Sequence, residues 1–251
     1  MSTWIFFRGL MRESRHWGEF PALFQHAMAE QPVVLLDFPG NGCLHMQTSA
    51  RNIEEMVNFA RSQLQQLGHA PPYRLLAISL GAMVAVAWSR IYPEELEKMV
   101  LINTSLAPCN PFYHRLRPQN YLPLLRLLYG TAAQRESLIL RLTSTRSRTE
   151  VLQATLGNWV AYAKEYPISR ANILRQLKAA LAYRASPNKP PVPVLLLAAE
   201  QDRLVNVKSS IALAQHWGCA IKLHSTAGHD LPLDDCAWVI QQIKEWTQAD
   251  Y

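Results

Sequence analysis

The fold is indicated most clearly by residues 75–85, which read Leu75-Leu76-Ala77-Ile78-Ser79-Leu80-Gly81-Ala82-Met83-Val84-Ala85. The apolar residues before the serine predict a buried strand and those after it predict a helix, so Ser79 lies in a tight turn between the two. Ala77 and Gly81 are small, as a strained turn packed against a strand and a helix requires. This setting directs the Ser79 hydroxyl out of the sheet, near the positive end of the following helix. The Leu80 N–H is then placed where an oxyanion would form, which makes Ser79 a candidate nucleophile.

Short apolar runs on either side of this stretch alternate with amphipathic ones. The runs lack the alternation of a half-exposed strand, which is expected when helices cover both faces of a parallel sheet. Between them lie segments with helical spacing, such as the one that begins at Ile53 and stops at Gly68. We therefore predict an α/β fold with a mostly parallel sheet and helices on both faces. The predicted strands are residues 4–7, 33–37, 74–79, 99–103, 192–199 and 221–225, and the predicted helices of this part are residues 53–67, 207–217 and 233–246.

Residues 106–190 break this alternation. They contain no convincing strand, and a stiff linker, Pro187-Asn188-Lys189-Pro190-Pro191, leads from them to the next strand. Because strand and helix alternate again after the linker, the segment interrupts one sheet and does not begin a second independent domain. We predict a core of residues 1–105 and 191–251 and an all-helical insertion at residues 106–190. Its predicted helices are residues 121–129, 132–142, 151–166 and 169–183.

Two later predicted strands end next to polar residues that a nucleophilic serine would need. Asp202 follows the fifth predicted strand, and His229 follows the sixth. Open α/β sheets place their active sites just beyond the carboxyl ends of the strands, so both side chains are expected near Ser79. A histidine can accept the serine proton, and a carboxylate can orient the imidazole and favour its charged form. Glu200 is the alternative acid.

These features resemble the α/β-hydrolase fold family of serine esterases. The G-x-S-x-G pattern of that family is matched with Ala77 in place of the first glycine, and Ser79, Asp202 and His229 follow its chain order. Its D-x-P-G-x-G turn after the second strand is matched by Asp37-Phe38-Pro39-Gly40-Asn41-Gly42. The resemblance implies Ser79 as nucleophile, His229 as general base and Asp202 as the acid that orients the histidine. It also implies that residues 106–190 form a helical cap over the active site.

The loop after the first strand departs from this family. Where many members read His-Gly-x, this chain reads Arg8-Gly9-Leu10. The resemblance implies that the Leu10 N–H is the second oxyanion donor, beside that of Leu80. The Arg8 guanidinium is a candidate group for binding a substrate carboxylate or phosphate. The other role open to Arg8 is to pair with a nearby carboxylate such as Glu13 and hold the loop, and we favour this structural role.

Composition and missing motifs exclude several other classes of protein. With 251 residues and 49% hydrophobic content, the chain can bury a large core. Residues 1–9 lack the basic start of a signal peptide, and no run of about 18 apolar residues predicts a membrane span. The four cysteines are scattered, so we expect reduced thiols in a cytoplasmic protein. The sequence has no P-loop, HExxH or Cys/His cluster, and Gly40-Asn41-Gly42 lacks the third glycine of a dinucleotide fingerprint, so we expect neither a metal nor a cofactor.

The net charge of +6 is concentrated in the insertion. Residues 106–190 carry 13 Lys or Arg against 3 Glu and no Asp, whereas the rest of the chain carries 12 against 16. Among the basic residues are Arg115, Arg117, Arg126, Arg135, Arg141, Arg146 and Arg148. They would suit an acidic partner, namely an acyl carrier protein, the phosphates of CoA or an anionic lipid surface. Solvated helix faces explain such arginines equally well, and no nucleic acid partner is expected because no nucleic-acid motif accompanies them.

The sequence therefore predicts a hydrolase that acts on a small-molecule carboxylic ester or thioester through an acyl-enzyme, with water as the second nucleophile. The nearest alternative is a cofactor-free C–C hydrolase or lyase on the same scaffold, in which Arg8 binds an anionic substrate. A further alternative is a ligand-binding protein that retains the three residues of the triad without appreciable turnover.

Overall fold

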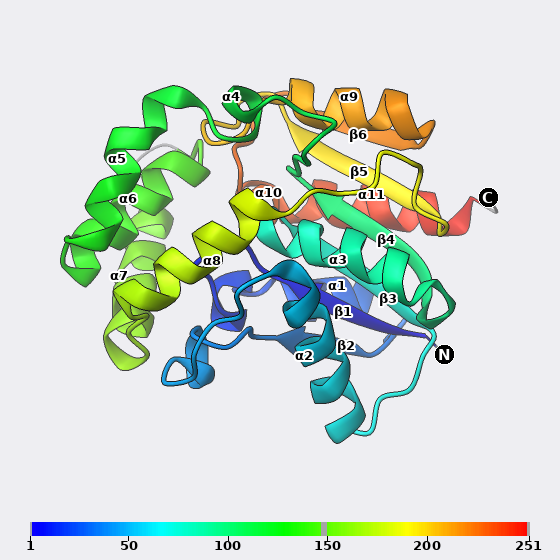
Figure 1. Ribbon diagram of the computed structural model, residues 1–251, viewed down its shortest axis with the longest axis horizontal. Helices are drawn as coiled ribbons and strands as arrows, with labels where there is room; N and C mark the ends of the chain where they lie inside the picture. Colours follow the sequence, from blue (N-terminus) through cyan, green and yellow to red (C-terminus); the bar gives the residue numbers. More distant parts are fainter. Residues whose placement is uncertain (1, 147–149, 250–251) are drawn as a thin grey trace.

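One parallel sheet organises the chain. In the part that the computed structural model describes, residues 2–146 and 150–249, six strands form a sheet in the order β2-β1-β3-β4-β5-β6 (Figure 1). Every pair of neighbouring strands is parallel. The strands are β1 (Thr3–Phe7), β2 (Val33–Leu36), β3 (Tyr73–Ile78), β4 (Leu96–Ile102), β5 (Val194–Ala199) and β6 (Ala220–His224). The predicted α/β fold with a parallel sheet is confirmed.

Helices cover both faces of this sheet, as predicted. Three helices pack on one face and two on the other, and β1 contributes side chains alternately to the two layers (Figure 1). Ile5 and Phe7 enter the first layer, Trp4 and Phe6 enter the second, and all four are fully buried. The first layer contains α2 (Ile53–Gln66), α3 (Leu80–Ile91) and α9 (Lys208–Trp217), and the second contains α1 (Phe20–Ala27) and α11 (Cys236–Gln248).

The C-terminal helical region differs from the prediction of a single helix at residues 233–246. It consists of two helices, α10 (Leu231–Asp234) and α11. The break occurs at Asp235, whose side chain accepts a hydrogen bond of 3.0 Å from the Trp238 N–H. Asp235 therefore caps the start of α11.

Between β4 and β5 the chain is helical, as predicted. Three of the four predicted helices are present, with each end within one residue of the prediction. The predicted helix at residues 121–129 is interrupted, because α5 ends at Leu125 and continues as a 3-10 turn. The helices are α4 (Phe112–Arg115), α5 (Tyr121–Leu125), α6 (Ala132–Thr143), α7 (Glu150–Glu165) and α8 (Arg170–Ala182), and the 3-10 turns beside α5 are η4 (Pro118–Asn120) and η5 (Arg126–Leu128).

The insertion has a small hydrophobic core of its own. Six buried side chains form it, and Met11 joins them from the loop after β1. In Figure 1, α5, α6 and α7 lie together at the left, where the strands end. The division into a core of residues 1–105 and 191–251 and a cap of residues 106–190 stays a prediction. The six side chains are Leu127, Leu138, Ile139, Leu140, Trp159 and Ile173.

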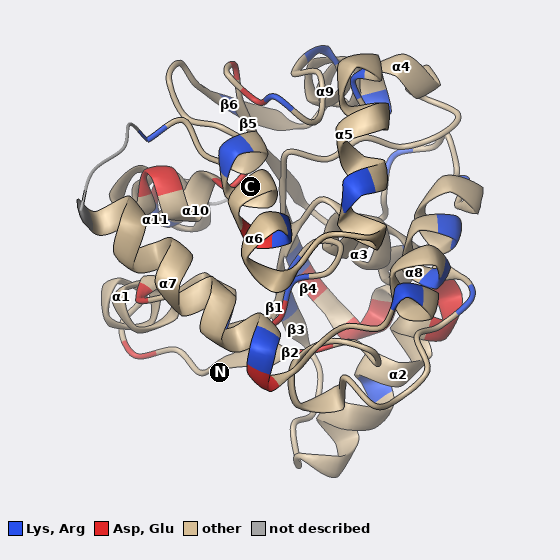
Figure 2. Cartoon of the chain, turned by 90° about the vertical axis from the view of Figure 1, so that its left-hand side faces the viewer, with Lys and Arg blue, Asp and Glu red and all other residues tan. Residues whose placement is uncertain are grey.

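The surface of the insertion is basic. Figure 2 looks at this side of the molecule and shows Lys and Arg residues on α5, α6 and α8. Arg148, named above among the basic residues, lies outside the described residues. Within the described ranges, no helix has both the length and the apolar character that crossing a bilayer requires.

The strand order has a switch point between β1 and β3. From β1 the chain passes to β2 on one side, whereas β3 and all later strands lie on the other side. The loops that follow β1 and β3 therefore leave the sheet in different directions, and open α/β sheets bind ligands at such a switch point. The loop after β1 begins at Arg8, and the turn after β3 is Ser79.

Candidate active site

Ser79 occupies a strained turn between β3 and α3. Its backbone angles are φ 54° and ψ −111°, a region that residues other than glycine rarely adopt. Its N–H donates to the Ile102 carbonyl at 3.1 Å. Two residues after Ser79, Gly81 leaves room that a side chain would fill. A Cβ there would lie 2.7 Å from the Phe7 carbonyl oxygen and 2.8 Å from that of Arg8. The small residue of the motif thus lets α3 approach the end of β1.

The loop after β1 passes directly beside Ser79. A Cβ on Gly9 would lie 3.4 Å from the Ser79 Cβ and 3.9 Å from its Oγ. Leu10 comes next on this loop, and Leu80 begins α3 immediately after the serine. The two predicted oxyanion donors therefore lie on the two segments that flank Ser79.

His229 and Asp202 are in contact. The His229 Nδ1 lies 2.6 Å from Asp202 Oδ2, and both side chains are buried. Asp202 Oδ1 accepts the backbone N–H groups of Leu204 at 2.7 Å and Val205 at 2.9 Å, and its second oxygen contacts the imidazole. This hydrogen bond assigns the imidazole proton to Nδ1 and leaves Nε2 as the acceptor. Glu200, the alternative acid, is exposed.

The pKa of His229 is raised above its ordinary value of 6.5. Burial lowers it, but the charge of Asp202 and the hydrogen bond to it outweigh burial, and the charge of Asp230 acts in the same direction. Arg8 acts in the opposite direction and lowers this pKa. The site therefore favours the imidazolium that forms when a base accepts a proton.

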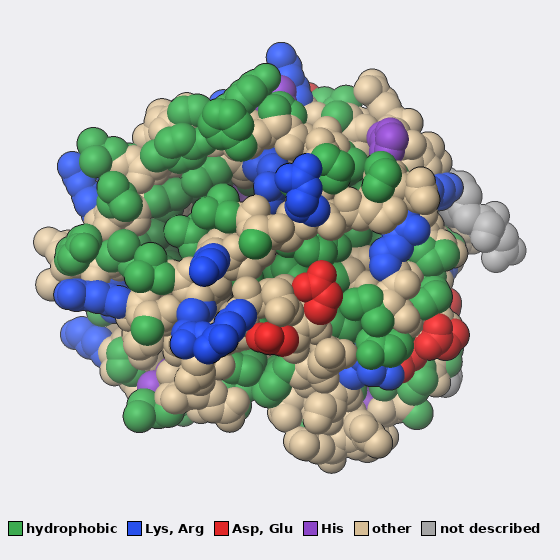
Figure 3. Space-filling model, viewed as in Figure 1, with side chains coloured by type: hydrophobic (Ala, Val, Ile, Leu, Met, Phe, Trp, Pro, Cys, Tyr) green, Lys and Arg blue, Asp and Glu red, His purple; other side chains and the backbone are tan. Residues whose placement is uncertain are grey.

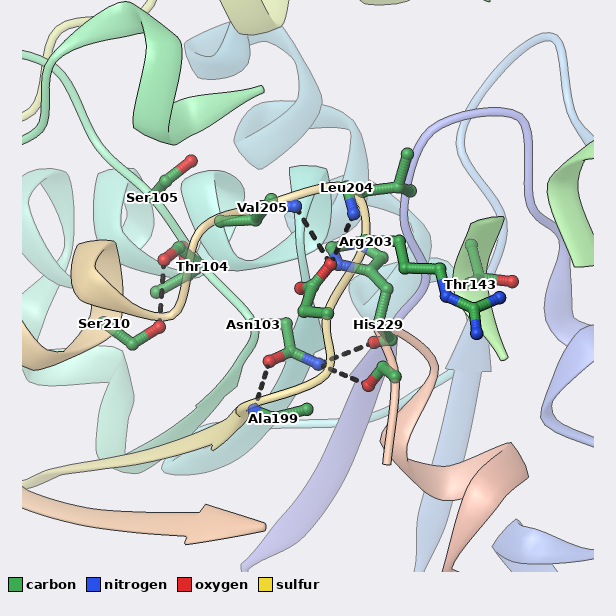
Figure 4. A network of polar contacts seen from close by, with 12 residues as sticks. Asn103, Thr104, Ser105, Thr143, Ala199, Arg203, Leu204, Val205, Ser210 and His229 are labelled. Carbon is green, nitrogen blue, oxygen red and sulfur yellow. Dashed lines mark hydrogen bonds and ion pairs between the residues drawn. The ribbon is translucent and has the colours of Figure 1, made fainter. Parts of the chain in front are cut away.

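Asn103 holds the histidine loop, and the sequence analysis did not identify it as a site residue. Its Nδ2 donates to the carbonyls of His229 at 2.7 Å and Gly228 at 3.2 Å, and its Oδ1 accepts the Ala199 N–H at 2.8 Å (Figure 4). It has a φ of 47°, which asparagine tolerates better than most residues. An asparagine directly after a buried strand, β4, was the available signal. The side chain ties the ends of β4 and β5 to the loop that carries His229.

Arg8 pairs with Asp230, so the expected pairing with Glu13 is wrong. The Arg8 Nη1 donates to Asp230 Oδ1 at 3.1 Å and Nη2 donates to Oδ2 at 2.5 Å. The chain turns between the two expected partners, with the Arg12 N–H donating to the Gly9 carbonyl at 3.2 Å. Glu13 accepts instead from the Arg15 Nε at 2.6 Å. Arg8 does pair with a carboxylate, as expected, but the carboxylate is that of Asp230.

A cavity of about 90 Å³ joins these elements. Ser79, His229, Leu10 and Arg8 line it on the side of the sheet. The insertion contributes an apolar wall, and Arg12, the second arginine of the lining, forms two hydrogen bonds with Glu136. The apolar residues of this wall are Leu124, Leu127, Ile139 and Trp159. In the described part of the chain, no three or more His, Cys, Asp or Glu side chains are grouped so as to hold a metal ion.

Solved structures of enzymes named for different activities share this fold. The enol-lactonase from Burkholderia xenovorans LB400 is 16% identical, with a TM-score of 0.80 over 98% of this chain and 92% of that one. The hydrolase BphD for 2-hydroxy-6-oxo-6-phenylhexa-2,4-dienoate from Rhodococcus sp. strain RHA1 is 18% identical, with a TM-score of 0.79 over 99% and 91%. The carboxylesterase CesB from Bacillus subtilis is 18% identical, with a TM-score of 0.77 over 100% and 85%. At such identities these similarities concern the fold alone.

A curated relative matches only part of the chain. The uncharacterized protein YbdG of Bacillus subtilis (strain 168) is 25% identical over 88 residues, which are 35% of this chain and 27% of that protein. The chain thus matches little more than a quarter of that relative's length. The family model of the alpha/beta hydrolase fold matches residues 5–235. Because this match covers nearly the whole sheet and the whole insertion, the chain belongs to the α/β-hydrolase fold family.

Proposed function

We propose that this protein is a serine hydrolase that cleaves a carboxylic ester or thioester through an acyl-enzyme. The observation that carries the proposal is the 2.6 Å contact of His229 Nδ1 with Asp202, made by an imidazole that lines the same cavity as Ser79. In this proposal Ser79 is the nucleophile, His229 the general base and Asp202 the acid that orients it. The N–H groups of Leu10 and Leu80 hold the oxyanion.

The reaction proceeds in two similar halves. Ser79 Oγ attacks the substrate carbonyl carbon while its proton passes to His229 Nε2, and the carbonyl oxygen becomes an anion that accepts the two backbone N–H bonds. When the tetrahedral intermediate collapses, the bond to the leaving group breaks and His229 returns the proton to the alcohol or thiol. Water then attacks the acyl-enzyme in the same way and releases the carboxylic acid and free Ser79.

The cavity supports an apolar acyl group. Its wall from the insertion is apolar, and its two arginines are already bound to carboxylates, Arg8 to Asp230 and Arg12 to Glu136. C–C hydrolysis of an anionic substrate, as considered from the sequence, would require the Arg8 guanidinium to bind that substrate. The engagement of Arg8 with Asp230 favours ester or thioester chemistry.

An anionic portion of the substrate would bind outside the cavity, and we propose CoA or an acidic carrier protein as its source. Two of the three glutamates of the insertion are paired with core residues, Glu136 with Arg12 and Glu165 with Arg15. Glu136 is buried, Glu165 is more than half exposed but bound to Arg15, and basic groups of the insertion face solvent together with exposed hydrophobic side chains (Figure 3). Such a surface attracts acidic partners.

Labelling with a fluorophosphonate probe tests the nucleophile. We expect the parent protein to label and to hydrolyse p-nitrophenyl esters of acetyl to decanoyl chains, with the highest turnover for the short ones because the cavity is small. Ser79→Ala should abolish labelling, and Ser79→Ala and His229→Ala should each lower kcat by at least about a thousandfold. The measurement is gel fluorescence together with release of p-nitrophenolate.

A parent protein that neither labels nor turns over these esters would contradict the proposal. It would favour a ligand-binding protein that retains the three residues without turnover. Exposed Ser137→Ala on α6 is the matched serine control, and it should label as the parent does.

A further inference from the structure

The buried ion pair of Arg8 and Asp230 joins two loops of the site. Arg8 follows β1, Asp230 follows His229, and the two residues are 222 positions apart in the chain. Their side chains are 5% exposed each and form two parallel hydrogen bonds, the geometry in which a guanidinium fixes a carboxylate most firmly. The guanidinium also lies over the ring of Trp17, 4.7 Å from its centroid.

Arg8 and Asp230 each lie next to a residue of the proposed catalytic machinery. Gly9, which follows Arg8, lies against Ser79, and Leu10 carries the proposed oxyanion donor. Asp230 follows the proposed base. The ion pair therefore spans from the segment that would bind the oxyanion to the segment that would move the proton.

We propose that Arg8 and Asp230 are a positioning pair that holds the Leu10 loop against the His229 loop and neutralises the carboxylate beside the imidazole. The proposal rests on the function proposed above. It assigns Arg8 a role other than substrate binding and makes Asp230 a necessary partner.

The pair also sets the charge that His229 experiences. The charged groups that act most strongly on the imidazole are Asp202 from the loop after β5, Asp230 from its own loop and Arg8 from the loop after β1. The two carboxylates raise the pKa of His229 and Arg8 lowers it. Arg8→Gln should therefore raise this pKa, Asp230→Asn should lower it, and the double variant should return it close to that of the parent.

Arg8→Lys separates positioning from charge. Lysine keeps the positive charge but cannot form the two-fold contact with Asp230. We expect a His229 pKa near that of the parent, an almost unchanged KM and a kcat lower by about 10- to 100-fold, as small displacements of catalytic groups cause. A merely structural pair would not separate kcat from KM in this way.

Glu136→Gln is the matched control. Glu136, on α6, accepts two hydrogen bonds from Arg12, at 2.7 and 3.1 Å. This ion pair is about as buried as that of Arg8 and Asp230, and its arginine lies on the same loop as Arg8. Glu136 is not among the leading causes of the raised pKa of His229. The control should lose thermal stability as the Asp230→Asn variant does, without a change in the pKa of His229.

The experiment measures kcat and KM for p-nitrophenyl acetate against pH, and titrates the His229 ring protons by NMR in a Ser79→Ala background. Opposite shifts of the pKa in Arg8→Gln and Asp230→Asn, with compensation in the double variant, support the proposal. Shifts in the same direction, no shift, or an Arg8→Lys variant with parental kcat overturn it.

The remaining outcomes are also decisive. If either single variant fails to fold, the double variant and Arg8→Lys carry the test, because neither leaves a buried charge without a partner of opposite sign. If the parent protein hydrolyses no ester, the proposed function fails, while the NMR titration still decides whether the pair controls His229. If Ser79→Ala abolishes turnover and the pair variants behave as the parent, only the positioning pair is wrong.

Discussion

Ser79 has a backbone conformation that costs a non-glycine residue free energy, of the order of 1–3 kcal/mol. The surrounding atoms maintain it: the Ser79 N–H is bound to β4, and Gly81 brings α3 against the end of β1. Neighbouring atoms also hold His229, because its carbonyl accepts a hydrogen bond from Asn103 and its ring contacts Asp202. Ser79 is thus held through its backbone, and His229 through both its backbone and its ring.

The raised pKa of His229 predicts the acidic limb of the pH profile. A general base works only when neutral, so kcat/KM should fall as the pH drops through the raised pKa, at a midpoint above 6.5. Asp202→Asn removes the charge and hydrogen bond that raise the pKa and leaves burial, which lowers it, so the midpoint should move to lower pH. The measurement is kcat/KM for p-nitrophenyl acetate from about pH 5 to about pH 9. A midpoint that does not change in Asp202→Asn would contradict this account.

The grouping of the candidate site residues could be predicted because they lie at strand ends. The sequence places Ser79, Asp202 and His229 after three strands of one sheet, and parallel strands bring such positions to one edge. Partners chosen by tertiary packing were not predictable. Arg8 was expected to find a carboxylate five residues away and finds one 222 residues away, because loops that are distant in sequence meet at the switch point.

At the scale of elements, strand β3, the Ser79 turn and α3 form the unit that orients the site. The strands were predictable because short uninterrupted apolar runs are typical of strands in a parallel sheet that is covered on both faces. The interruption after Leu125 and the break at Asp235 were not predicted, since both depend on local hydrogen bonds at helix ends and not on the apolar repeat. Helix α1 was missed, although a proline at its first turn is a helix-start signal.

Two glycines in helices should respond oppositely to alanine. In α3, a Cβ on Gly81 would meet backbone oxygens at 2.7 and 2.8 Å, so Gly81→Ala should destabilise the protein by about 1–3 kcal/mol and reduce turnover. In α7, nothing lies within 4 Å of a Cβ on Gly157, so Gly157→Ala should stabilise by up to about 1 kcal/mol. Urea unfolding at unchanged m-value measures both. Equal stabilities for the two variants would show that the close approach of α3 to β1 is not required.

The whole molecule separates its charge into two parts. The insertion carries the positive excess and the rest of the chain a small negative one. A groove on the insertion is lined by Leu122, Leu125 and Tyr129 together with Arg126 and Arg141, so apolar and basic groups occur side by side on its outer surface.

This separation predicts that salt affects anionic and neutral substrates differently. The kcat/KM for an acyl-CoA thioester should fall several-fold as salt rises, because ions shorten the reach of the field to about 8 Å at 0.15 M. A neutral p-nitrophenyl ester should be unaffected. The double variant Arg126→Gln/Arg141→Gln should weaken the dependence, whereas Lys244→Gln on α11 should leave it unchanged. Equal salt dependence for both substrates would contradict the CoA or carrier proposal.

The two ends of the insertion lie side by side. Ala107 and Arg184 form a parallel bridge, and the Ala185 N–H donates to the Ala107 carbonyl at 2.6 Å. During folding, β4 and β5 therefore pair only after a loop of about 90 residues has closed, an entropic cost that grows slowly with loop length. The sheet is accordingly almost indifferent to how long the insertion is. Evolution or a protein engineer can exchange the segment for a longer, shorter or differently charged one and retain the same carboxyl edge of the sheet.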